Sequence, residues 1–283
     1  MDTQVRPTTT MPEFSSDAEG MLAKIQAGQQ LESRSEMTED YYNNLVNLLR
    51  QQADSELAGA AGYVPWIMKA PNIEEKLIVA NIVKDEVRHA KACYKVLEGL
   101  GVDVDEIIKQ ADYTMRVAAE AAELGTSRAS DDKRVNIFYY TIDSWTDFIM
   151  FNFCMDRAAG HQLDDVLKSS YGPWSRAIVQ IAKEEVVHIH HGDNWVRKLA
   201  TNPETKDEVQ AALDRWYPRT MNIFGRPGTK RNALYRQYGI KQRDNNEVRD
   251  VFKAEVEALV NEFGLRMPDW TPDYETSSER FGA

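Results

Sequence analysis

The sequence of 283 residues is poor in cysteine, with only Cys93 and Cys154. Two cysteines cannot form the disulfide framework of a small secreted domain, so a reducing compartment is expected. The chain has no uninterrupted apolar run of about eighteen residues, and its N-terminus lacks a signal peptide's apolar core. Basic residues are in the minority, and the net charge of −11 argues against nucleic acid as a partner. These absences indicate a soluble cytoplasmic protein.

The length exceeds that of most single domains, but it is compatible with one large domain that carries tails. Residues 1–37 are rich in Thr, Ser, Gln and Glu, which is typical of a flexible segment. We therefore predict a flexible N-terminal segment over residues 1–37, one domain over residues 38–265, and a C-terminal tail over residues 266–283.

The apolar pattern and the helix-boundary residues predict an all-α fold without a convincing strand. Asn72 is expected to cap the second helix, and Pro65 is expected to end the first. Pro173 is suited to the first turn of a later helix. We expect helices over residues 38–62, 72–99, 104–124, 130–160, from 173 onward, 203–216 and 246–263.

One motif occurs twice within these expected helices. Glu86 and His89 form a Glu-x-x-His sequence, and Glu185 and His188 form a second one. Residues three apart on an α-helix project from the same face, so both side chains of each motif can reach one metal ion.

Each motif follows a carboxylate at a matching distance. Glu86 follows Glu56 by 30 positions, and Glu185 follows Asp156 by 29. A chain that ascends one helix and descends the next returns to the same height after such a spacing. The matched spacing favours Asp156 over the upstream acids Asp143 and Asp147.

A single Glu-x-x-His is weak evidence, because both residue types are common on solvated helix faces. Two copies with matched upstream carboxylates are much stronger. In addition, residues 148–155 are strongly apolar, and an acid directly after them, Asp156, needs a partner. Four carboxylates and two histidines are the ligand set of a dinuclear metal site in a four-helix bundle. We therefore predict a ferritin-like bundle with additional helices that activates dioxygen with two iron ions.

Several segments resemble a known family in the same order along the chain. The segment SSYGPWSRAIVQIAKEEVVH over residues 169–188 is similar to the catalytic A subunits of bacterial phenylacetyl-CoA epoxidases. These are ring-1,2-phenylacetyl-CoA monooxygenases of the ferritin-like di-iron carboxylate family. The other similar segments are DSEL at 54–57, WIMKAP at 66–71, KDEVRH at 84–89, DRAA at 156–159, MNIFG at 221–225 and GLRMPD at 264–269.

This resemblance implies an oxygenase that adds one oxygen atom from O2 across the aromatic ring of an aryl-CoA thioester. It also implies accessory subunits, a homologous metal-free subunit and a reductase that passes electrons from NADPH. The family's two irons are held by residues that match Glu56, Glu86, His89, Asp156, Glu185 and His188.

The ligand types suggest which of the six residues bridge the two ions and which bind one ion each. Glu86 and Glu185 are the expected bridges, Glu56 and Asp156 the terminal carboxylates, and each histidine binds one ion. The outer ring nitrogens of the histidines need acids that orient them. Asp85, Asp147 and Glu184 are the candidates, although each could equally be a solvated or structural charge.

The chain also departs from the bacterial epoxidases. It is longer between Gly99 and Asn136, and it has Val87, Arg88 and Arg157 where the family has glycine. These differences leave the acyl group open, and the ligand set accepts manganese as well as iron. The alternatives are another di-iron enzyme, such as an N-oxygenase, a desaturase or a ferroxidase, and a non-catalytic scaffold subunit.

Two further groups of residues could bind the substrate. Arg226, Lys230 and Arg231 lie on a Gly/Pro-rich segment and could contact the phosphates of CoA, although an ordinary solvated loop explains them as well. An aromatic group could line an aryl pocket, but at helical spacing such residues are more often core. Its members are Tyr139, Tyr140, Trp145, Phe148 and Phe151.

Overall fold

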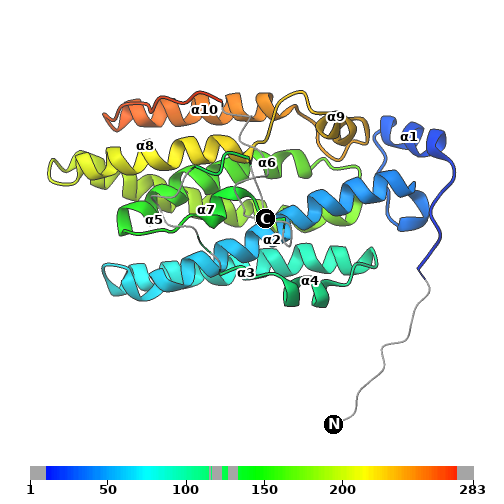
Figure 1. Cartoon of the computed structure of the whole chain (residues 1–283), viewed down its shortest axis with the longest axis horizontal. Coiled ribbons are helices and arrows are strands. Elements are labelled where there is room, and N and C mark those ends of the chain that lie inside the picture. Colours follow the sequence, from blue (N-terminus) through cyan, green and yellow to red (C-terminus); the bar gives the residue numbers. More distant parts are fainter. Residues whose placement is uncertain (1–10, 115, 117–122, 127–132, 273–283) are drawn as a thin grey trace, which may run out of the picture.

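Four long helical segments form a bundle at the centre of the computed structural model, which describes residues 11–114, 116, 123–126 and 133–272 (Figure 1). The first pair is α2 (Glu39–Lys69) with α3 (Ile73–Gly99), and these two helices share the most extensive contact in the fold. The second pair is α7 (Gly172–Thr201) with a segment made of α5 (Trp145–Phe151), a π-helical turn (Asn152–Asp156) and α6 (Arg157–Val166). The expected all-α, ferritin-like class is confirmed.

Further helices cover this bundle. Helix α8 (Lys206–Ile223) packs on α5 and α7, and α10 (Asn245–Glu262) packs on α6 (Figure 1). The shorter helices α1 (Ala18–Gln26) and α9 (Lys230–Gln237) lie together at one end of the molecule, and α4 (Val104–Gln110) follows α3. None of the helices in the described part combines the length and apolar character needed to cross a membrane.

Two helix starts lie where the sequence predicts them. Asn72 accepts a hydrogen bond from the Glu75 amide at 2.8 Å and caps α3, as expected. Pro173 lies in the first turn of α7, also as expected. These helix starts matter because α3 and α7 carry the two Glu-x-x-His motifs.

Two predicted helix ends are wrong, because buried side chains hold the helix across a proline. Helix α2 continues through Pro65 to Lys69, and Trp66 stacks on Phe148 with the ring centroids 5.7 Å apart. Helix α8 continues through Pro218 to Ile223, where Thr220 is fully buried. In both cases tertiary packing outweighs the lost backbone hydrogen bond.

The helix expected over residues 130–160 begins only at Trp145, where Ser144 caps it. Residues 127–132 lie outside the described part of the chain. Residues 133–140 instead cross α2 and include a short 3-10 helix, Asn136–Tyr139. Their backbone is bound by α2 side chains: the Lys133 amide donates to Asp54 at 2.8 Å, and the Val135 amide donates to Ser55 at 3.0 Å. These bonds replace the helical ones.

The expected helix over 104–124 is also shorter, because α4 ends at Gln110. Residues 111–114, 116, 123 and 124 are not helical, and residues 115 and 117–122 are not described. The helix α9 was missed, since its eight residues contain few apolar positions. Among the described residues the structure has no strand, and Leu31 and Tyr171 form an isolated bridge.

The N-terminal segment is more ordered than predicted over its described part. Residues 18–26 form α1, and Leu31 and Met37 are fully buried. The Leu31 amide donates to Ser170 O at 2.7 Å, and the Gly172 amide donates to Leu31 O at 3.0 Å. This segment is thereby joined to the start of α7. Residues 1–10 and the tail over 273–283 lie outside the described part, and the predicted domain limits stay a prediction.

A charge cluster joins α6, α7 and α10 on one side of the bundle. Arg157 is almost fully buried, and its guanidinium donates to Glu255 at 2.8 Å and to Asp193 at 2.5 Å. His161 pairs with the other Glu255 oxygen at 2.7 Å. The hydrogen bonds from His161 and Arg157 lower the pKa of Glu255 to about 2.

We expect Glu255→Gln to destabilise the protein by about 1 kcal/mol at pH 7, a small value because the side chain is 43% exposed and solvent screens the pair. The folded-state pKa lies below the ordinary value of 4.5, so this contribution is present above pH 4.5 and is lost as pH falls towards 2. Denaturant unfolding of the wild type and of Glu255→Gln between pH 7 and pH 3 measures this contribution to the free energy of unfolding. Glu257→Gln, an exposed position on the same helix, is the control. A stability difference that grows on acidification would contradict the prediction.

Candidate metal centre

The predicted metal-binding residues come from every segment of the bundle and face its interior. Helices α3 and α7 each present one Glu-x-x-His motif, α2 presents one carboxylate, and the π-helical turn presents another. These residues are Glu56, Glu86, His89, Asp156, Glu185 and His188. All are buried except Glu56, which is partly exposed.

Four of the residues form a compact group in which a metal ion could lie. Ligand atoms of Glu56, Glu86, His89 and Glu185 all lie within 4.8 Å of one another. His188 adjoins this group, with Nδ1 at 3.3 Å from a Glu86 oxygen and 3.7 Å from a Glu185 oxygen. His89 Nδ1 lies 3.3 Å from the other Glu185 oxygen. Glu185 therefore lies between the two imidazoles.

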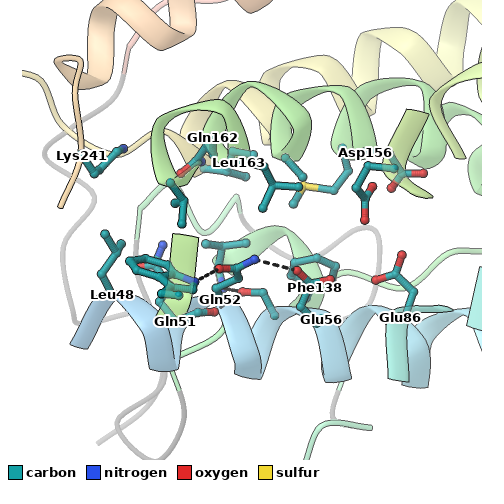
Figure 2. Close-up of a pocket in the computed structure, with 18 of the residues that line it drawn as sticks. Leu48, Gln51, Gln52, Glu56, Glu86, Phe138, Asp156, Gln162, Leu163 and Lys241 are labelled. Atoms are coloured by element: carbon teal, nitrogen blue, oxygen red, sulfur yellow. Dashed lines mark hydrogen bonds between the residues drawn. The ribbon is translucent and has the colours of Figure 1, made fainter. Parts of the chain in front are cut away.

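Asp156 lies beside this group rather than within it. One carboxylate oxygen accepts a hydrogen bond from the Tyr63 hydroxyl at 3.3 Å, and the other is buried without a hydrogen-bond partner in the described part of the chain. Figure 2 shows Asp156 opposite Glu86 across the pocket. The sequence did not identify Tyr63 as part of this region.

Burial and the close approach of the side chains shift the pKa values of the predicted ligands. Burial raises the pKa of Glu86 to about 8 and that of Asp156 well above its ordinary value. Burial alone would lower the pKa of His89, but the adjacent carboxylates of Glu185 and Glu56 raise it to about 11. Burial likewise opposes the rise at His188, where Glu185 and Glu86 raise the pKa to about 12. Metal ions displace such protons when they bind.

A second observation supports metal binding by these side chains. Nδ1 of both histidines and one Asp156 oxygen are buried and lack a hydrogen-bond partner among the described residues. Buried polar atoms are seldom left in that state. Carboxylate oxygens and imidazole nitrogens are ligands that iron and manganese accept.

Acids outside the cluster face the other nitrogens of the histidines. His89 Nε2 lies 2.8 Å from Glu184, and His188 Nε2 lies 3.7 Å from Asp85. Arg88 bridges these two acids, with both nitrogen–oxygen distances 2.8 Å. The arrangement is reciprocal, because the acid next to each motif faces the histidine of the other. A hydrogen-bonded acid such as Glu184 holds the ring orientation of a ligating histidine. Asp85 lies too far from His188 Nε2 for a hydrogen bond in this structure.

The third acid considered for this role, Asp147, lies elsewhere. It accepts a hydrogen bond from the Trp216 indole at 2.7 Å and pairs with Arg215, so its role is structural. His190 is exposed, and His191 pairs with Glu75 at 2.8 Å. Both histidines therefore lie apart from the predicted ligand set.

The π-helical turn that carries Asp156 is made possible by a glycine on α7. A Cβ atom on Gly192 would lie 2.7 Å from the backbone nitrogen of Phe153, which real contacts do not reach. The two backbones therefore approach more closely than any other residue allows. π-Helical turns often mark functional sites. Nothing in the local sequence predicted this turn, since it depends on a contact between distant segments.

Four of the predicted carboxylate ligands, Glu56, Glu86, Asp156 and Glu185, line a pocket that we call the inner pocket. Its volume is about 90 Å³. Its walls are mostly apolar, with Phe138, Met155 and Leu163 among them. Gln52 also lines it: its amide donates to Glu56 at 3.2 Å and accepts from the Trp174 indole at 2.9 Å (Figure 2). This chain of hydrogen bonds orients Glu56.

The aromatic group considered from the sequence is mostly core and does not line the inner pocket. Phe148 and Tyr139 are fully buried, and Tyr140 and Phe151 are nearly so. Phe138, Tyr63 and Trp174 are the aromatic residues that line the inner pocket instead. Sequence alone could not separate these groups, because both lie in similar apolar surroundings.

A larger cavity adjoins the inner pocket; we call it the outer cavity. Its volume is about 370 Å³. The two spaces share the lining residues Leu48, Gln51, Gln162, Ile223 and Lys241. Four cationic side chains line the outer cavity: Lys133, Arg226, Arg231 and Lys241. Arg226 and Arg231 are two of the three basic residues considered from the sequence, and Lys230 is not part of the lining.

Comparison with known proteins agrees with this description. Residues 14–282 match a family described as phenylacetic acid catabolic protein. The A subunit of the 1,2-phenylacetyl-CoA epoxidase from Escherichia coli (strain K12) is 30% identical over 262 residues. That match covers 89% of this chain and 78% of the relative.

Proposed function

The chain belongs to the phenylacetic acid catabolic protein family, and from this we propose that it is the oxygenase subunit of an aryl-CoA epoxidase. Its reaction is the insertion of one oxygen atom from O2 into the aromatic ring of an aryl-CoA thioester, with phenylacetyl-CoA as the first candidate. The observation that carries this proposal is the convergence of all six predicted ligand residues on the bundle interior, where four of them line a pocket.

The site would hold two iron ions through Glu56, Glu86, His89, Asp156, Glu185 and His188. When bound, the metal pair supplies electrons that activate dioxygen, so one oxygen atom enters the ring and the other leaves as water. The two electrons come from NADPH through a separate reductase. We further propose that the other partners are accessory subunits and a homologous metal-free subunit, as the resemblance implies.

The residues around the cluster have separate tasks in this proposal. Gln52 and Tyr63 orient Glu56 and Asp156, and Glu184 holds the His89 ring. The apolar wall of the inner pocket excludes water from the reacting ring. Tyr63 and Gln52 keep their ligand carboxylates in place while the substrate enters and leaves.

The lining and charges of the two spaces support an aryl-CoA ester. The inner pocket, at about 90 Å³, is smaller than the cavity of about 150 Å³ that takes benzene, so its lining must widen to admit one ring and a second ring is excluded. The outer cavity offers Lys133, Arg226 and Arg231 to the phosphates of CoA. An aryl-CoA ester carries an apolar ring that matches the inner pocket and phosphates that match the cationic outer cavity.

The iron-loaded chain, combined with its metal-free partner, a reductase and NADPH, tests this proposal with phenylacetyl-CoA under isotopically labelled dioxygen. Mass spectrometry should find one labelled oxygen atom in the CoA thioester and none when NADPH is omitted. A dehydrogenated product without label would indicate a desaturase. An absence of any product, with iron bound and reduced, would contradict the proposed function and favour the scaffold alternative.

A further inference from the structure

A buried lysine lies at the junction of the inner pocket and the outer cavity. Lys241 is only 6% exposed and lines both spaces. Figure 2 places it at one end of the pocket, with Glu86 and Asp156 at the other. Nothing in the metal site requires a cation at this distance, so its presence calls for another explanation.

The Lys241 ammonium group has no hydrogen bond or ion pair with any residue that the structure describes. The nearest acids have other partners: Asp165 accepts from Arg243 at 2.6 Å, and Asp244 caps α10 through the Asn246 amide. Burial lowers the pKa of Lys241, which is the response expected of a charge without a partner. Burying a cation without a partner costs free energy, so we expect an oxygen atom of a bound substrate to be its partner.

The backbone that carries Lys241 is firmly fixed. The amides of Ile240 and Lys241 donate to Tyr235 O at 2.8 and 3.2 Å, closing the end of α9. Gly239 adopts φ +61° there, and its carbonyl accepts from the Ser170 amide at 2.8 Å. This turn is therefore bound to the segment that begins α7, the helix of Glu185. A recognition group on such a support is preorganised.

The position of Lys241 corresponds to a particular part of the proposed substrate. Leu48 and Lys241 lie at the same end of the inner pocket (Figure 2), and along α2 Leu48 is eight residues, or about 12 Å of helix, from Glu56 at the metal cluster. With the ring at the cluster, the arm that joins the ring to the phosphates passes this point. That arm contains the thioester carbonyl and the first pantetheine amide, both neutral hydrogen-bond acceptors.

We propose that Lys241 is a specificity-determining residue that donates a hydrogen bond to a carbonyl oxygen of the thioester–pantetheine arm. This inference rests on the proposed function. It means that the chain recognises the linker between the ring and the phosphates.

The test compares the wild type with Lys241→Met, a substitution of similar length without the charge. The two probes are phenylacetyl-CoA and the N-acetylcysteamine thioester of phenylacetate, which keeps the thioester and first amide but has no phosphate. Calorimetry on the metal-loaded chain gives both affinities. A lost hydrogen bond from a charged group should weaken both probes by a similar factor, about tenfold or more.

Arg231→Gln is the matched control, since Arg231 lines only the outer cavity and should matter for phenylacetyl-CoA alone. If Lys241→Met leaves binding of the N-acetylcysteamine thioester unchanged, the proposal is wrong, whatever happens with phenylacetyl-CoA. A wild type that binds neither probe would instead contradict the proposed function. Thermal unfolding checks that Lys241→Met is folded, and Lys241→Gln replaces it if it is not.

Discussion

Replacing Glu185 by alanine is expected to remove metal binding and with it ring oxygenation. Glu185 approaches both histidines, so its loss takes a ligand from both proposed ions at once. Changes in groups that merely support a ligand usually cost about 10- to 100-fold in metal affinity or activity. The loss of a shared ligand should exceed that range. Elemental analysis gives the metal content, and product formation with phenylacetyl-CoA gives the activity.

Glu184→Gln is the matched comparison for this experiment. Glu184 is the neighbouring residue on α7, and it contacts His89 from outside the cluster. The substitution Glu184→Gln should therefore lower the metal affinity by about 10- to 100-fold and leave some activity. Glu185→Gln adds a variant of nearly native size without the charge. Full metal content and turnover in Glu185→Ala would show that the ligand assignment is wrong.

Replacing Gly192 by valine is expected to destabilise the fold by about 3 kcal/mol. The new Cβ would lie 2.7 Å from Phe153 N and 3.0 Å from Phe153 Cα, and a backbone cannot rotate away as a side chain can. The π-helical turn must shift, and Asp156 at its end must shift with it. For a protein of this size, the midpoint of thermal unfolding should fall by roughly 10 °C, with reduced metal content.

Gly99→Ala is the control for the valine substitution. Gly99 is the last residue of α3, and a Cβ placed there meets no atom within 4 Å. Alanine at this position should change stability by no more than about 0.5 kcal/mol. If Gly192→Val unfolds at the wild-type temperature, the close approach of α7 to the π-helical turn is not a constraint on the fold.

The parts of the fold that follow from local rules could be predicted from the sequence. The all-α class, the Asn72 cap and the first-turn position of Pro173 depend on residues close together in the chain. The boundaries that failed depend on distant contacts. Trp66 holds α2 together beyond Pro65 by packing on Phe148, and Asp54 draws the Lys133 amide away from a helix.

The candidate site divides in the same way. The motifs could be found because a spacing of three places Glu86 and His89 on one helix face, and the matched spacing pointed to Glu56 and Asp156. Glu184 on α7 faces His89 on α3, and Asp85 on α3 faces His188 on α7. This arrangement requires α3 and α7 to be neighbours in a specific register. Lys241 has no local signal at all, because its importance arises from burial at the junction of two spaces.

The most direct test of the account is the metal content of the wild-type chain after anaerobic loading with Fe(II). The six-residue cluster predicts about two iron ions per chain, coupled to each other in their Mössbauer and magnetic properties. A single uncoupled ion, or no bound metal, would contradict the dinuclear centre on which the proposed reaction depends.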